Sequence, residues 1–244
     1  MDKIKVSAVS YTNSIPFVLG IKSSKVVLEQ IDLSLDIPSD CATKLAEGKV
    51  DIGLVPVAII PQISNAEIIG DYCIGSDGAV DSVFIFSHVP IEEIKTLCLD
   101  NHSRTSNNLA KVLLKNYWKL QPNFIKDGEG EWDARVLIGD RTFGKKGDYA
   151  YVYDLGEYWK KFTGLPFVYA AWVSTKKLNP EFIFQFNEAL KFGLSKRKEV
   201  IDQIPVRSDF DYDDYLMNKL DFDLNAEKRK ALNLFLEYIS KLDQ

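Results

Sequence analysis

The sequence has few of the residues on which the common catalytic and metal-binding motifs depend. Its 244 residues include only two histidines, His88 and His102. Neither has a Cys or a carboxylate at the spacing of a zinc or non-haem iron site. No Gly-x-Ser-x-Gly elbow, Walker loop or Rossmann fingerprint is found. These absences exclude the enzyme classes that such motifs mark, and we expect no metal site.

Cysteine pairs and long apolar runs are missing too. The three cysteines, Cys41, Cys73 and Cys98, form no C-x-x-C pair and leave one without a partner, which is typical of buried thiols in a reducing compartment. No apolar run approaches the roughly 20 residues needed to span a bilayer, and the first residues do not resemble a secretory signal. We therefore expect a cytoplasmic protein that does not enter a membrane.

A charge of one sign is also lacking. The chain has 30 Lys and Arg against 35 Asp and Glu, a net charge of -5, and the two signs are interspersed. This excludes the basic surface by which proteins bind nucleic acid or an anionic membrane, and no obligate protein partner is evident. An anionic ligand would need local hydrogen-bond donors.

The chain does contain an alternation of short apolar strands and helices. Strands are predicted over residues 4–9, 26–35, 51–55, 82–87, 96–99, 135–140 and 166–173. Helices are predicted over 38–45, from Pro56, after Ser103 and from Pro180 onward. This order is typical of α/β proteins with a mostly parallel sheet.

No long linker or internal repeat divides the chain into consecutive domains. We expect two discontinuous lobes, with the chain crossing near Phe86 and returning near Trp172. Residues 1–85 would then pack with 173–244 as lobe I, and residues 86–172 would form lobe II. Two strand crossings of this kind make a natural hinge around a cleft.

The strongest candidate anchor for a ligand is Ser103-Arg104-Thr105-Ser106, at a predicted helix start. Unpaired backbone N–H groups and the helix dipole favour an anion there, and three hydroxyls can donate further bonds. Ser and Thr at a helix start also act simply as caps. Three hydroxyls and an arginine exceed what capping requires, so we predict a carboxylate site.

Polar turns supply the remaining candidates. The small-residue loop with Ser76, Gly78 and Ser82 lets backbone N–H groups approach a ligand, although a plain turn before a strand has the same pattern. Asn13 is either an Asx-turn residue or a donor and acceptor for a ligand. Asp140 is either a helix cap or an orienting group. Ser10 and Ser39, in the turn after the first strand and at the next helix start, complete the predicted binding set.

Several segments taken together are more specific than any one of them. They comprise residues 9–16, 46–57, 76–83, 103–106, 138–140, 153–159 and 163–168. In this order they resemble the chorismate dehydratase family of the futalosine route to menaquinone, over nearly the whole chain. One departure is Thr12, where the family more often has Leu.

The resemblance implies a two-lobed periplasmic-binding-protein-like (type II) fold, with a mixed, mostly parallel sheet in each lobe and a cleft between them. It also implies a carbon-oxygen lyase that converts chorismate to 3-[(1-carboxyvinyl)oxy]benzoate and water without a metal or organic cofactor. The residues that match the family's catalytic positions are Asn13 and Ser82. The alternatives are a non-catalytic carboxylate-binding protein of this fold, and the sister enzyme 1,4-dihydroxy-6-naphthoate synthase, whose N-terminal motif is rich in Cys and Pro.

Overall fold

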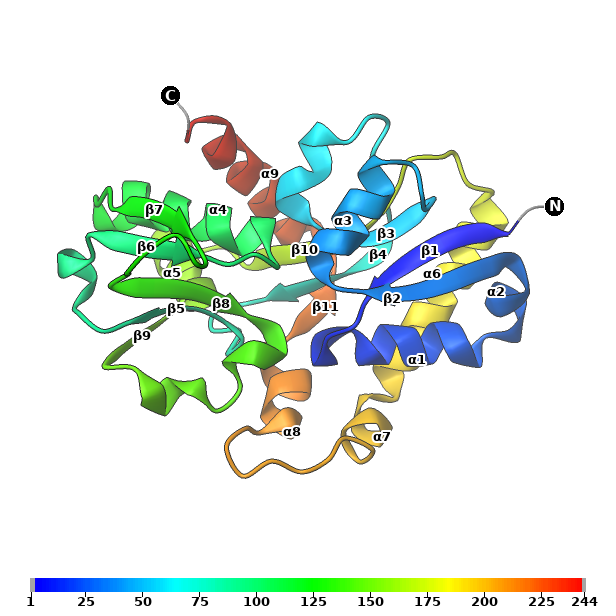
Figure 1. Ribbon diagram of the computed structural model, residues 1–244. Coiled ribbons are helices and arrows are strands. Elements are labelled where there is room, and N and C mark those ends of the chain that lie inside the picture. Colours follow the sequence, from blue (N-terminus) through cyan, green and yellow to red (C-terminus); the bar gives the residue numbers. More distant parts are fainter. Residues whose placement is uncertain (1–2, 243–244) are drawn as a thin grey trace.

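The computed structural model describes residues 3–242, which form two α/β lobes side by side (Figure 1). The larger lobe is built on a six-stranded sheet of order β11-β4-β10-β3-β1-β2, and the smaller lobe on a five-stranded sheet of order β7-β6-β8-β5-β9. Both sheets are mixed. This arrangement confirms the predicted α/β class with two lobes.

The six-stranded sheet combines strands from both ends of the chain. Its members are β1 (Ile4–Val9), β2 (Ile31–Asp36), β3 (Ile52–Pro56), β4 (Glu67–Ser76), β10 (Phe167–Ser174) and β11 (Asp221–Asp223). The central strand β3 is buried along its whole length. β1 runs parallel to β2 and β3, whereas β10 is antiparallel to both β3 and β4. The polar turn after β1 consequently lies at the carboxyl end of a parallel pair, where α/β folds place ligands.

Helices cover both faces of this sheet (Figure 1). They are α1 (Ile15–Ser23), α2 (Lys25–Gln30), α3 (Pro38–Ala46), α6 (Pro180–Ser195), α7 (Arg197–Ile201), α8 (Tyr212–Asp214) and α9 (Ala226–Ser240), with the 3₁₀ segments η1 (Thr12–Ser14) and η2 (Val57–Gln62) and the π-helix η7 (Tyr215–Lys219). α1 and α6 pack closely, because Gly20 and Gly193 let the two backbones touch. The start of α1 thereby fixes the turn that precedes it.

The five-stranded sheet is built from the middle of the chain. Its strands are β5 (Val83–Ser87), β6 (Thr96–Leu99), β7 (Asn123–Lys126), β8 (Ala134–Ile138) and β9 (Tyr151–Asp154). The helices of this lobe are α4 (Arg104–Leu113) and α5 (Leu155–Thr163), with the short segments η3 (Ile91–Glu93), η4 (Leu114–Trp118), η5 (Gly139–Thr142) and η6 (Lys145–Asp148). The side chains of Ser103 and Asp154 cap α4 and α5, so polar residues end the strands as predicted.

Three details differ from the sequence-based expectation. Parallel pairs do not predominate, because β10 and β11 add antiparallel pairs to the first sheet and β5 adds two to the second. Residues 26–35 are not one strand, since Ser24 caps α2 before β2 begins. The helix after Pro56 is a 3₁₀ segment.

The predicted crossings between the lobes, near residues 86 and 172, lie close to the points where the chain passes from one sheet to the other. β5 pairs only within the five-stranded sheet, and β10 pairs only within the six-stranded sheet, among the described strands. The positions 86 and 172 lie inside these two strands. The division into residues 1–85 with 173–244 and 86–172 stays a prediction.

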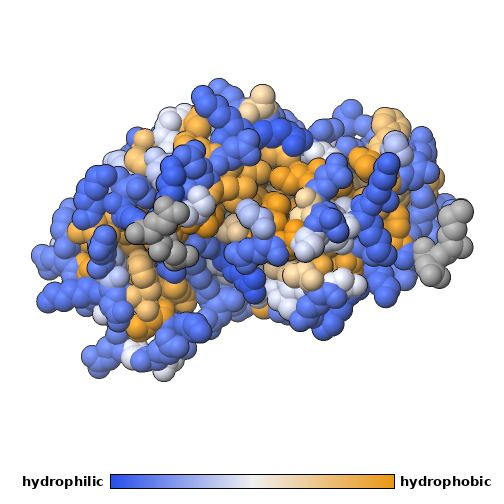
Figure 2. Space-filling model, turned by 90° about the horizontal axis from the view of Figure 1, so that it is seen from above, coloured by the Kyte–Doolittle hydropathy of each residue, from blue (hydrophilic) through white to orange (hydrophobic). Residues whose placement is uncertain are grey.

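Contacts between the lobes are both apolar and polar. Figure 2 shows hydrophobic residues gathered toward the middle of the face seen from above, with polar residues toward both ends. In the middle of the molecule, the start of α4 meets η2, and the backbone N–H of Ala58 donates to Thr105 Oγ1 at 3.2 Å. Farther along, Phe210 stacks on Phe143. The two lobes therefore meet in a closed arrangement.

Candidate functional site

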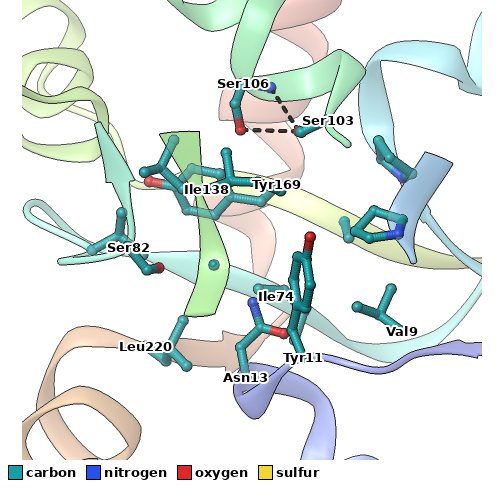
Figure 3. A pocket seen from close by; sticks show the side chains of 16 residues that line it. Val9, Tyr11, Asn13, Ile74, Ser82, Ser103, Ser106, Ile138, Tyr169 and Leu220 are labelled. Atoms are coloured by element: carbon teal, nitrogen blue, oxygen red, sulfur yellow. Dashed lines mark hydrogen bonds between the residues drawn. The ribbon is translucent and has the colours of Figure 1, made fainter. Parts of the chain in front are cut away.

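A small cavity of about 50 Å³ lies between the two lobes. Strand ends and turns from both sheets surround it, with the start of α4 on one side and the first turn of the chain on the other (Figure 3). Its lining consists of Val9, Tyr11, Asn13, Pro38, Pro56, Ile74, Val80, Ser82, Val83, Ser103, Ser106, Ile138, Gly139, Tyr169, Ala170 and Leu220. Apolar side chains thus form the walls, and a few hydroxyl and amide groups provide directed contacts.

None of the lining side chains carries a formal charge. The start of α4 instead provides a partial positive charge beside the cavity, because the first N–H groups of a helix have no partner within the helix. Ser103 Oγ accepts from the N–H of Ser106 at 3.1 Å, and its hydroxyl donates to Ser106 Oγ at 3.0 Å. Both hydroxyls are buried and face the cavity (Figure 3). Neutral donors at a helix start suit an anionic ligand group.

Asn13 and Ser82 lie on the opposite side of the cavity from this helix (Figure 3). Asn13 belongs to η1, and its buried Oδ1 atom has no hydrogen-bond partner. Ser82 is 2% exposed, and its Oγ accepts a hydrogen bond of 2.9 Å from the hydroxyl of Tyr215. Burial raises the pKa of Tyr215 far above its usual range, and its hydrogen-bonding contacts with Ser82 and Asn13 offset part of this increase. The polar groups of Asn13, Ser82 and Tyr215 therefore lie close together beside the cavity.

A buried carboxylate holds the loop that carries Ser82. Asp154 accepts hydrogen bonds from the N–H groups of Val80 and Asp81 and from two N–H groups at the start of α5. Asp81, directly before Ser82, has a φ of 63°, a left-handed conformation that a non-glycine residue adopts only when its surroundings require it. Burial raises the pKa of Asp154 to about 6, although these donors lower it. The loop conformation thus depends on one carboxyl group.

Two polar links join the first turn to the smaller lobe. The N–H of Thr12 donates to both oxygens of Asp140 at 3.1 Å, and the Thr12 hydroxyl donates to Oδ2 at 3.0 Å. Burial raises the pKa of Asp140 despite these bonds. The hydroxyl of Tyr11 lies 2.7 Å from His102 Nδ1. These links hold the Asn13 turn against the other lobe.

The ring of Tyr11 also requires a glycine opposite. Gly139 has a φ of 59°, and a Cβ there would lie 2.6 Å from Tyr11 Cδ2. Behind this contact, Arg141 pairs with the buried Asp100 at 2.5 Å. The same carboxylate accepts from the N–H of His102 at 2.6 Å. His102, which contacts the Tyr11 hydroxyl, is therefore held in place by the carboxylate of the Asp100–Arg141 ion pair.

The structure brings four of the predicted residues to the cavity, namely Asn13, Ser82, Ser103 and Ser106. Seven others lie outside its lining. Ser10 and Arg104 are exposed, Ser39 is half-buried beside Pro38, and Gly78 is half-buried in its loop. The Ser76 hydroxyl is 3.1 Å from that of Tyr169, Thr105 binds Ala58, and Asp140 binds Thr12. Their roles in ligand binding stay predictions.

The sequence-based prediction missed three tyrosines. Tyr11 and Tyr169 line the cavity, and Tyr215 reaches it through Ser82. Tyr11 stands within the recognised first turn, so its position was a usable signal. Tyr215 lies 133 residues after Ser82, and no local pattern marks it, because isolated aromatic residues on helices most often belong to the core.

Along residues 3–242, no three His, Cys, Asp or Glu side chains gather in a metal-ligating cluster. Within the same range, no helix is long and apolar enough to cross a bilayer.

Two mixed sheets in separate lobes, with a cavity between them, define a periplasmic-binding-protein-like α/β protein. Solved structures agree with this class. Protein AF1704 from Archaeoglobus fulgidus matches with a TM-score of 0.73 and 14% identity, over 98% of this chain and 97% of that one. The Candida albicans CA3427 gene product, described as having the generic periplasmic binding protein fold, matches with a TM-score of 0.65 and 14% identity, over 99% and 94%.

Sequence comparison defines the family within this class. The family described as menaquinone biosynthesis matches residues 4–241, and the chain belongs to it. One relative is the chorismate dehydratase of Thermus thermophilus, which is 25% identical over 223 residues, 77% of this chain and 81% of the relative.

Proposed function

We propose that this protein is a chorismate dehydratase, a hydro-lyase that converts chorismate to 3-[(1-carboxyvinyl)oxy]benzoate and water in menaquinone biosynthesis. The observation that carries the proposal is the family match over residues 4–241. The relative named chorismate dehydratase supports it. The cavity supports it as well, since Asn13 and Ser82, which match the catalytic positions of the family, both line it.

The substrate has two carboxylates, and the site offers a different environment for each. The ring carboxylate is assigned to the start of α4, where the helix dipole favours an anion and Ser103 and Ser106 present buried hydroxyls. Because the Ser103 hydroxyl donates to Ser106 Oγ, the Ser106 proton remains for the carboxylate. Thr105 supports this assignment indirectly, because its bond to Ala58 holds the helix start against the larger lobe. The enolpyruvyl carboxylate is then assigned to the side of Asn13 and Ser82.

The reaction requires loss of the proton on C3 and of the hydroxyl on C4. The C3 proton is vinylogously alpha to the ring carboxylate, so its removal pushes negative charge toward that group. Donors at the start of α4 would stabilise the charge, and one well-placed donor contributes about 3 kcal/mol to lowering such a barrier. The C4–O bond then breaks, the departing hydroxide takes up a proton to give water, and the ring becomes aromatic.

A proton acceptor for C3 is supplied in this proposal by the substrate itself. Neither histidine lines the cavity, and His102 is held by Tyr11 and Asp100. The enolpyruvyl carboxylate is tethered next to C3, and an intramolecular base of this kind gains a large effective concentration. Asn13 and Ser82 would hold it in the reactive orientation.

Substrate access requires the lobes to separate. The cavity of about 50 Å³ has room for only a few water molecules, so chorismate must enter a more open form. We propose that the lobes comprise residues 1–85 with 173–244 and residues 86–172, and that they close on the substrate. Closure would exclude water and align the donors. We also propose a cytoplasmic location, where chorismate is available.

Incubation of the purified protein with chorismate, followed by mass spectrometry, tests the proposed function. A product lighter by one water, with a benzoate ultraviolet spectrum, is the expected result. Chorismate that is bound but recovered unchanged would instead indicate a non-catalytic carboxylate-binding protein of this fold.

A further inference from the structure

We propose that Tyr215 is a positioning residue that directs the hydroxyl proton of Ser82 into the cavity. This inference rests on the proposed function, because it assigns Tyr215 a part in the same site. It follows from one hydrogen bond, from the burial of both partners and from the number of protons that each hydroxyl can donate.

Tyr215 lies directly behind Ser82 as seen from the cavity. Its hydroxyl donates to Ser82 Oγ at 2.9 Å, and the two residues are 1% and 2% exposed. Tyr215 itself is not part of the lining. It therefore acts on a ligand only through the residues in front of it.

Because each hydroxyl has a single proton, donation by Tyr215 determines where the Ser82 proton can point. A hydroxyl has one proton to donate and two lone pairs that accept. Since burial keeps the Tyr215 phenol protonated at ordinary pH, its only proton is directed at Ser82 Oγ. The Ser82 proton is then free to point away from Tyr215, toward the ligand. If the bond ran in the opposite direction, the Ser82 hydroxyl would donate its proton to the tyrosine oxygen. Ser82 would then present only a lone pair to an anion.

Asn13 shares the same hydroxyl. A hydrogen-bonding contact with the Asn13 side chain lowers the pKa of that phenol, so Asn13 lies next to the Tyr215 hydroxyl. The buried Oδ1 atom of Asn13 has no partner in the protein. Tyr215 thus donates to Ser82 and also lies in contact with Asn13, the other predicted catalytic side chain.

Both lobes hold the tyrosine ring in place. It packs edge-on against Phe143 at 5.5 Å and Phe210 at 5.3 Å, and Phe143 follows η5 of the smaller lobe. Tyr215 also begins η7, where its N–H donates to the carbonyl of Asp211. A ring fixed in this way keeps the donor direction constant, which is what preorganisation of a site requires.

Replacement by phenylalanine tests the inference with little change in packing. Tyr215→Phe should lower kcat for chorismate by about tenfold to hundredfold and leave KM within about twofold, because orientation rather than binding is lost. Tyr212→Phe, in the same aromatic group but without contact to Ser82, is the matched control and should keep wild-type kinetics. Wild-type kcat in Tyr215→Phe would overturn the inference while leaving the proposed function intact.

A double-variant cycle separates positioning from a general structural effect. If Tyr215 acts through Ser82, adding Tyr215→Phe to Ser82→Ala should lower kcat by less than about twofold further. A further loss equal to that of the single variant would contradict the inference.

A readout independent of turnover uses a thiol in place of the hydroxyl. In Ser82→Cys, donation from Tyr215 should stabilise the thiolate, so adding Tyr215→Phe should raise the pKa of the introduced thiol by about one unit. Thiolate absorbance measures this, because burial raises the pKa of Cys41 and Cys73 to about 12 and that of Cys98 as well. An unchanged thiol pKa would overturn the inference whether or not chorismate is the substrate.

Discussion

At the residue scale, the site works with neutral groups in a confined space. Asn13, Ser82, Ser103 and Ser106 are each weak donors or acceptors in water, where solvent competes for every bond. In a buried cavity the same dipoles interact more strongly with charge that develops on a substrate. The site therefore depends on the orientation of these groups rather than on an ionised side chain.

Removal of the two predicted catalytic side chains should separate turnover from binding. Asn13→Ala and Ser82→Ala should each reduce kcat by about a hundredfold, with a much smaller change in the Kd of the benzoate product, since their contacts form mainly in the transition state. Kinetics and calorimetry with the product measure the two effects. Asn116→Ala, at a half-buried position outside the cavity lining, and Ser195→Ala, at an exposed one, are the controls. Unchanged turnover in both site variants would reject the assignment.

The raised pKa of Asp154 predicts a pH-dependent stability. Because its folded pKa of about 6 exceeds the unfolded value near 3.8, the folded state binds more protons between these values, and stability from this group falls as pH rises from about 4 to about 6. Relative to the wild type, Asp154→Asn should gain up to about 3 kcal/mol of unfolding free energy over that window.

Denaturant unfolding of both proteins at several pH values measures this difference. A constant offset between wild type and Asp154→Asn across the window would show that burial does not raise this pKa.

At the element scale, the strands and caps follow from local pattern, whereas the close contacts do not. Residues 4–9 are a predictable strand, and Ser103 is a predictable cap, because apolar runs and helix starts are encoded locally. Residues 26–35 were mispredicted as one strand. Their apolar pattern fits both the short helix α2, which Ser24 caps, and the strand β2 that follows it. Antiparallel β10 was not foreseen, since 90 residues separate the end of β4 at Ser76 from the start of β10 at Phe167, and strand direction depends on that connection.

Among the site residues, the first turn and the α4 start could be predicted because their polar side chains follow directly on strands. The Tyr215 contact could not, because it joins residues 133 positions apart. The turning of Thr105 toward Ala58 could not be predicted either, since each residue along a helix rotates the direction of its side chain by about 100°, and the contacts of the other lobe decide which hydroxyl faces the cavity.

The α1 and α6 contact should be sensitive to a single methyl group. A Cβ at Gly193 would lie 1.9 Å from the Pro16 carbonyl oxygen, whereas a Cβ at Gly147 would meet nothing within 4 Å. Gly193→Ala should therefore lower the free energy of unfolding by about 1–3 kcal/mol or more. Gly147→Ala should leave it nearly unchanged. Equal effects in chemical denaturation would contradict this packing.

At the scale of the whole molecule, two lobes close through a few polar links at the first turn. Thr12 binds Asp140, and Tyr11 contacts His102, so the smaller lobe adds to the contacts that hold the segment carrying Asn13. Closure of the lobes would therefore complete the site. An open form in equilibrium would bind substrate, and the closed form would react.

Loss of the Asp140 link should shift the molecule toward the open form. Asp140→Ala should increase the radius of gyration in small-angle scattering without ligand, and raise KM several-fold, because the competent closed state becomes less populated. Asp148→Ala, which removes only an exposed ion pair with Lys145, is the control. A radius of gyration identical to that of the wild type would show that this link does not govern closure.

The proposed dehydratase activity is tested most simply by the fate of chorismate itself. Purified protein incubated with chorismate should yield a compound lighter by one water, with the absorbance of a substituted benzoate, and Ser82→Ala should form it far more slowly. Chorismate recovered unchanged from the wild-type protein, at concentrations that saturate its binding, would contradict the account.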